Sequence, residues 1–166
     1  DQDGWTWGVA PRFTTDFTLA GLRNELMVGA RYFAGHNVAR QYVNVAGSRG
    51  RRTLDSRQDA ANYEAFFENR LFVVPTLALV AGAKLMRAER DYRDLGGGLP
   101  NSLGDVRFGR TYDGFNPRIG LLWAPRQDVQ VFANLTRSRD VPDFTDLVQT
   151  QVSRTGFVPL QAQRAW

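Results

Sequence analysis

One polar stretch of this chain concentrates arginine, and its chemistry suits the binding of an anion. Five arginines lie between residues 35 and 62: Arg40, Arg49, Arg51, Arg52 and Arg57. Asp55 and Asp59 are the only acidic residues there, so the stretch has a net charge of +3, and Tyr42 and His36 lie beside it. Guanidinium groups form forked hydrogen bonds with carboxylate and phosphate oxygens. We interpret the first four arginines and Tyr42 as a candidate ligand-binding loop; the alternative is a solvated loop that contacts lipopolysaccharide phosphates.

A second set of charges is spread over segments of alternating polarity: Arg12, Arg23, Glu25, Arg31, Glu64, Glu68, Arg70 and Arg118. They could pair with one another across strands or hold another part of the protein. Glu64 and Glu68 are the only plausible carboxylate pair for acid–base chemistry. Four residues apart on a strand, they lie about 13 Å apart at 3.3 Å per residue, which is too far for a paired-carboxylate mechanism.

The sequence offers no other catalytic or metal-binding pattern. It contains no GxSxG, HExxH or P-loop motif, and Gly96-Gly97-Gly98 has no following Lys-Ser/Thr. With no cysteine and His36 as the only histidine, thiolate and multi-histidine metal sites are excluded. We therefore expect no enzyme activity, no cofactor and no metal site.

Composition leaves the class of protein open. The 166 residues carry a net charge of +4, which could suit nucleic acid or anionic lipid. No apolar run reaches the roughly 18 residues of a transmembrane helix. The chain opens on Asp1-Gln2-Asp3, which does not resemble a signal peptide.

Period-2 alternation predicts six strands, over residues 5–17, 23–34, 63–73, 77–86, 115–124 and 129–136. On one face these strands carry 33 residues and no charge; on the other they carry 31 residues, of which ten are charged. A charged side chain that faces lipid at mid-bilayer costs roughly 2–4 kcal/mol for arginine or lysine. The charge-free face is therefore the predicted lipid-facing side, and Arg12, Arg31, Glu64, Glu68 and Arg118 are predicted to face a lumen or a plug.

The connections between these strands alternate in length. Residues 18–22, 74–76 and 125–128 are short turns, whereas residues 35–62, 87–114 and 140 onward are long polar loops. Aromatic residues cluster at both ends of the apolar faces, as in interfacial girdles. Both features are typical of a transmembrane β-barrel of the bacterial outer membrane. Pro11 and Pro117 fall inside predicted strands, where a bulge would accommodate them.

Six strands cannot close a wide barrel, since the smallest bacterial outer-membrane barrels have about eight. We therefore expect an all-β, antiparallel, open segment of a larger up-and-down barrel.

Several segments resemble the barrel of TonB-dependent outer-membrane receptors. They are residues 115–125 (FNPRIGLLWAP), 128–147 (DVQVFANLTRSRDVPDFTDL), 158–165 (VPLQAQRA), and 63–70 followed by 77–83 (YEAFFENR, LALVAGA). Asn116 stands where the family usually has serine before the proline.

The resemblance implies that residues 1–166 form one part of a receptor barrel of about 22 strands. The plug domain would lie outside this chain. The resemblance also implies uptake of a ferric siderophore or similar iron chelate, driven by the TonB complex through a missing N-terminal region. Outer-membrane lipid and lipopolysaccharide would be partners, and nucleic acid would not. A passive porin-like channel and a soluble β-sandwich binding module remain alternatives.

Overall fold

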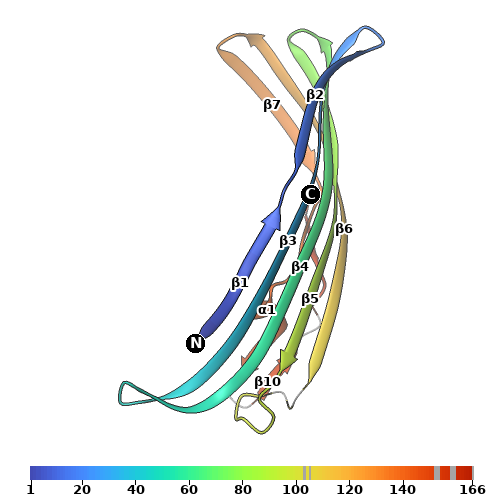
Figure 1. Cartoon of the computed structure of the whole chain (residues 1–166). Helices are drawn as coiled ribbons and strands as arrows, with labels where there is room; N and C mark the ends of the chain where they lie inside the picture. Colours follow the sequence, from blue (N-terminus) through green and yellow to red (C-terminus); the bar gives the residue numbers. More distant parts are fainter. Residues whose placement is uncertain (103, 105, 152–153, 158–159, 166) are drawn as a thin grey trace.

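One antiparallel sheet dominates the computed structural model, which describes residues 1–102, 104, 106–151, 154–157 and 160–165. The strands follow the order β1-β3-β4-β5-β6-β7, and β2 also pairs with β3 (Figure 1). Their bounds are β1 Gln2–Val9, β2 Arg12–Leu19, β3 Leu22–Val45, β4 Ser48–Val74, β5 Leu77–Asp94, β6 Arg107–Arg126 and β7 Val129–Thr136. The sheet is open, and all six predicted strands lie in it.

The predicted short turns are confirmed at one end of the sheet. β2 and β3 are joined by Ala20 and Gly21, with φ angles of 51° and 78°. Two consecutive positive φ angles give a type I′ turn, whose twist matches that of the flanking strands. Pro75-Thr76 and Gln127-Asp128 connect the next two hairpins at the same end.

The predicted loop conformation at the other end is wrong for most of its length. Residues 35–62 continue β3 and β4 into a long hairpin, closed by the tight turn Ala46-Gly47. β5 and β6 likewise extend into residues 87–114, which leaves residues 95–106 as the connection. These extensions carry no alternating apolar pattern because both of their faces meet polar surroundings, so periodicity could not distinguish them from loops.

Neither proline requires a bulge. Pro11 divides the predicted first strand into β1 and β2, but both halves keep one register against β3, and the Ala30 amide donates to the Pro11 carbonyl at 3.1 Å. Pro117 stays within β6 opposite Ala83, and its carbonyl accepts from the Arg137 amide at 3.1 Å. Each proline lacks a backbone N–H, but it stands where a run of ladder hydrogen bonds ends, so only one donor is lost. The sheet therefore tolerates both prolines.

The register aligns the predicted apolar faces of all six strands into one surface. The row through the centre of the band contains Thr15, Leu26, Asn69, Ala81, Ile119 and Leu135. Most large exposed apolar side chains of the sheet belong to this face, among them Phe13 at 62%, Ile119 at 60% and Leu85 at 58%. Such a continuous apolar surface is suited to lipid.

Aromatic rings line the edge of this surface that faces the long connections. Trp7, Tyr32 and Tyr63 come from three adjacent strands, with ring centroids 5.1 Å and 5.0 Å apart. Phe17 and Trp123 lie toward the short turns. The arrangement matches the aromatic girdles of membrane barrels.

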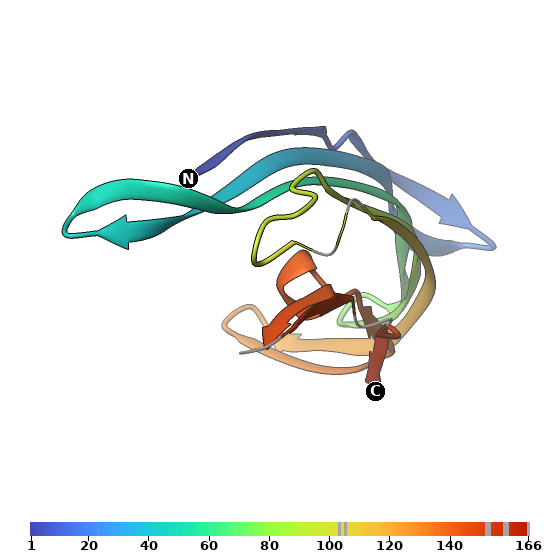
Figure 2. The same cartoon turned by 90° about the horizontal axis from the view of Figure 1, so that it is seen from below.

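The C-terminal part folds back onto the concave side of the sheet (Figure 2). It contains β8 Ser138–Asp140, the four-residue helix α1 Phe144–Leu147, β9 Val148–Gln151, β10 Arg154–Phe157 and β11 Gln163–Ala165. β8 pairs with β11, and the Tyr112 hydroxyl donates to the Leu160 carbonyl at 3.2 Å. Along β6, the Tyr112 side chain alternates onto the same side of the sheet as the charged residues, and it contacts this C-terminal part. The charged face of the sheet is therefore the concave one. Of the resembling segment 158–165, Val158 and Pro159 lie outside the described residues.

Candidate functional site

An ionic network crosses the concave face through β3, β4 and β6. Glu68 accepts from Arg118 at 2.9 Å and from Arg70 at 3.3 Å. Arg70 also lies 3.6 Å from Glu25, which pairs with Arg23. The Glu68 side chain is only 13% exposed. The network shows that structural pairing accounts for most of these charges.

A second, smaller cluster lies beside it. Glu64 is 3.6 Å from Arg31 and 3.3 Å from Lys84. Glu64 and Glu68 therefore have separate partners, as expected from their spacing along β4. Arg12 lies opposite Gly29 and makes no ion pair in the described part of the chain. The structure thus joins four of the five predicted lumen- or plug-facing residues to charged partners.

The five candidate ligand-binding residues lie together at the tip of the β3–β4 hairpin. Arg40 and Arg52 share Asp55, at 3.6 Å and 2.6 Å. Arg49 pairs with Asp1 and lies over the Tyr42 ring, 4.4 Å from its centroid. Arg40, Tyr42 and Arg49 line an open hollow of about 640 Å³ together with Asp1, whereas Arg51 and Arg52 lie outside its lining. Arg51 makes no ion pair with any described residue, so the tip keeps an excess of positive charge.

Among the described residues, the convex face carries charge only at the aromatic girdle and beyond it. Arg57, Arg93 and Arg107 are cross-strand neighbours on β4, β5 and β6. In a neighbouring row of the same face, Asp59 lies opposite Asp91. Asp59 accepts from Arg57 at 2.9 Å and lies 2.7 Å from His36 Nδ1. Burial acts to raise the pKa of Asp59, but the hydrogen bonds from Arg57 and His36 outweigh it, so the pKa lies below its usual value.

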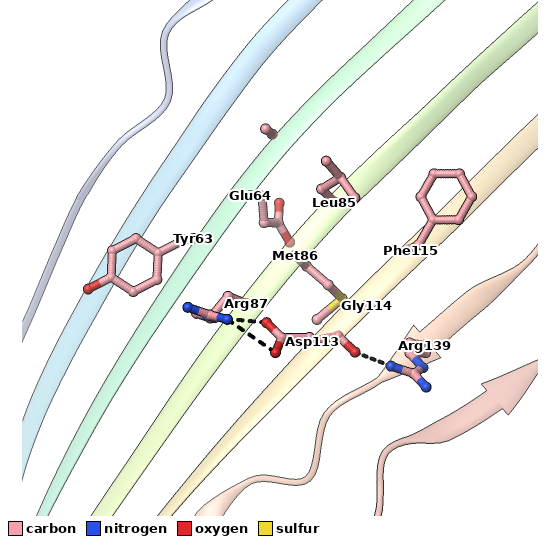
Figure 3. A pocket seen from close by; sticks show the side chains of 10 residues that line it. Tyr63, Glu64, Leu85, Met86, Arg87, Asp113, Gly114, Phe115 and Arg139 are labelled. Atoms are coloured by element: carbon pink, nitrogen blue, oxygen red, sulfur yellow. Dashed lines mark hydrogen bonds and ion pairs between the residues drawn. The ribbon is translucent and has the colours of Figure 1, made fainter.

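At the girdle itself, Arg87 spans β5 and β6 to reach Asp113. Its guanidinium donates to both carboxylate oxygens at 2.8 Å and 3.3 Å (Figure 3). The pair borders a hollow of about 600 Å³ whose apolar lining includes Tyr63, Leu85 and Phe115. A charged rim above an apolar hollow fits the boundary between lipid tails and headgroups.

Sequence reasoning missed one cluster of cations. Arg90 and Arg110 oppose each other in the β5–β6 ladder, as Arg139 and Arg164 do in the β8–β11 pair. Arg90 is half-buried, and burial lowers its pKa while Tyr112 and Asp143 act in the opposite sense. Only the registers of the β5–β6 and β8–β11 ladders reveal these pairs, and no sequence pattern marks those registers.

Among the described residues, no three histidine, cysteine or acidic side chains gather closely enough to hold a metal ion. In the same part of the chain, no helix has the length and apolar character needed to cross a membrane.

An open antiparallel sheet with an apolar, girdled convex face and a charged concave face defines a sector of a transmembrane β-barrel. The sequence model of the family described as "TonB dependent receptor-like, beta-barrel" matches residues 1–166. The chain belongs to the TonB-dependent receptor family, as its motifs predicted.

A solved structure supports this fold. The chain is similar to the crystal structure of the ferric citrate transporter FecA in the unliganded form, with a TM-score of 0.72 and 15% sequence identity. The match covers 83% of this chain and 21% of that one, so it corresponds to one part of a much longer barrel. No curated protein sequence matches the chain. A single open sheet of this kind does not fit the soluble β-sandwich alternative.

Proposed function

We propose that this chain is a section of the wall of a bacterial outer-membrane receptor that takes up an anionic ferric chelate. Its membership of the TonB-dependent receptor family over its full length carries the proposal. The excess of arginine at the long-connection end favours an anionic chelate. Energy would come from the TonB complex, through a plug and an N-terminal segment supplied elsewhere in the parent protein.

Uptake by cells tests this function. The full-length receptor would be expressed in a bacterium without its own ferric-chelate receptors, and radioactive iron supplied as ferric citrate or as a ferric siderophore. We expect accumulation that stops when TonB is deleted or the proton gradient is dissipated. Accumulation that persists without energy would instead indicate the passive channel.

The hairpin tip gives a prediction for the capture of the chelate. Replacing Arg49, Arg51 and Arg52 together by alanine should weaken binding of the transported ferric chelate about tenfold or more, because charge-assisted hydrogen bonds contribute roughly 1.5–3 kcal/mol each. Affinity is measured on the purified receptor by quenching of tryptophan fluorescence. Unchanged affinity would leave the tip as a solvated element that contacts lipopolysaccharide. Arg126→Gln, at the short-turn end, is the control for loss of charge.

We propose that the convex arginine row, Arg57, Arg93 and Arg107, contacts phosphates of lipopolysaccharide. Each basic side chain near an anionic lipid surface contributes roughly 1 kcal/mol. Arg93→Gln and Arg107→Gln should therefore each weaken lipopolysaccharide binding about fivefold, as measured with purified receptor and labelled lipopolysaccharide. Arg12→Gln removes the same charge from the concave face and should have no effect. Equal effects of all three substitutions would contradict the facing of the row.

A further inference from the structure

The concave face carries an unusual set of arginines at the long-connection end. Arg110 belongs to β6, Arg139 to β8 and Arg164 to β11, and the three line one polar hollow of about 280 Å³. In the described part of the chain, none of the three makes an ion pair with a carboxylate. Among the other concave arginines, Arg23, Arg31, Arg70 and Arg118 do, whereas Arg12 and Arg90 make none with a described residue.

The backbone holds these side chains close to one another. Arg139 and Arg164 are direct cross-strand partners, and Arg110 is the partner of the half-buried Arg90. Like charges directly opposite each other on antiparallel strands are destabilising. The arrangement therefore opposes folding unless something neutralises it. Asp113 is the one acidic residue among the described residues that line the hollow, and its carboxylate forms its ion pair with Arg87.

Neighbouring contacts fix the hollow in place. The Arg139 guanidinium donates to the Asp113 backbone carbonyl, which orients the group without forming an ion pair (Figure 3). The Asp113 carboxylate is directed instead to Arg87. The bond from the Tyr112 hydroxyl to the Leu160 carbonyl holds the segment before β11 against β6. Three guanidinium groups from three strands thus surround a preformed polar space.

We propose that Arg110, Arg139 and Arg164 bind a small, multiply charged oxyanion in this hollow. Guanidinium groups bind the planar edges of carboxylates and the oxygens of phosphates in a forked geometry. The site lies on the concave face, away from lipid, so the anion comes from solution. This inference rests on the proposed function in one respect: the anion would be the negatively charged part of the chelate.

Binding measurements on the full-length receptor test the site. Citrate, ferric citrate and inorganic phosphate serve as probes, titrated by calorimetry at low ionic strength. Each of Arg110→Gln, Arg139→Gln and Arg164→Gln should weaken binding about tenfold, and the triple variant should abolish it, because every guanidinium lost removes charge-assisted hydrogen bonds. Arg126→Gln, an exposed arginine at the opposite end of β6, should bind as the unmodified receptor does. Preference for citrate over phosphate would identify carboxylate as the ligand chemistry.

Thermal unfolding supplies a second readout that does not depend on affinity. Arg164→Gln should raise the Tm of the ligand-free receptor, because it removes the repulsion with Arg139. The same variant should lose the rise in Tm that the anion produces in the unmodified receptor. Arg164 accepts this substitution without loss of any hydrogen bond to a described residue, so misfolding is not expected.

The outcomes separate the site from the proposed function. If the unmodified receptor accumulates iron but the triple variant binds the probes equally well, the site is wrong and the function stands. If no ferric chelate is transported but arginine-dependent anion binding is seen, the site stands and the function is wrong. If none of the three probes binds the unmodified receptor even at millimolar concentration, the site is overturned.

Discussion

Replacing Ala81 by arginine is expected to lower the free energy of unfolding of the lipid-inserted receptor by about 2–4 kcal/mol. Ala81 lies on the convex face in the central row of the apolar band, between Asn69 and Ile119. At that depth a guanidinium reaches neither water nor an ion-pair partner. The measurement is reversible denaturation of the full-length receptor in lipid vesicles, followed by tryptophan fluorescence.

The control must place the same charge on the concave face without disturbing packing. Alternation alone selects Val80, which points away from lipid, but Val80 is only 8% exposed and its replacement would also disrupt packing. Phe132 is 70% exposed and has the parity of the concave face, so Phe132→Arg is the better control. We expect it to cost much less than Ala81→Arg. Similar costs for both would show that the convex face does not contact the membrane.

The membrane-spanning part of the fold could be predicted from sequence because lipid imposes a strict rule on each strand. A segment in which every second residue is uncharged, such as 77–86, is recognisable as a membrane-spanning strand. The same alternation predicts on which side of the sheet each of its residues lies. The register needs one further fact, the turn. Where the turn is two or three residues long, as at Pro75-Thr76, it determines the pairing of the whole hairpin.

Beyond the girdle that rule no longer applies, and prediction failed there. Water satisfies both faces of a protruding ribbon, so β3 and β4 extend through residues 35–62 without an apolar pattern. The arginines of the hairpin tip were found by composition alone, because they are close in sequence. Arg110, Arg139 and Arg164 come from three separate strands, so only the folded chain brings them together.

Replacing Glu68 by glutamine should destabilise the receptor by roughly 1–3 kcal/mol, since removing the buried carboxylate leaves Arg118 without an acidic partner, whereas Arg70 keeps Glu25. Among the described residues, Glu68 is the only carboxylate within ion-pair distance of Arg118, and it also accepts from Arg70. Both guanidinium groups remain about half exposed, which keeps the effect below that of a fully buried pair. Denaturation in lipid vesicles again gives the free energy of unfolding.

A matched substitution on the same face separates this pairing from a general effect of charge. Asp16 makes no ion pair with a described residue, and its cross-strand partner is Glu25, so Asp16→Asn should be neutral or slightly stabilising. A double-mutant cycle of Glu68→Gln with Arg118→Gln should give a coupling energy of about 0.5–3 kcal/mol. If the two substitutions were additive, the contact would contribute nothing to the fold. Arg118 would then be available to another part of the receptor, such as a plug that fills the lumen.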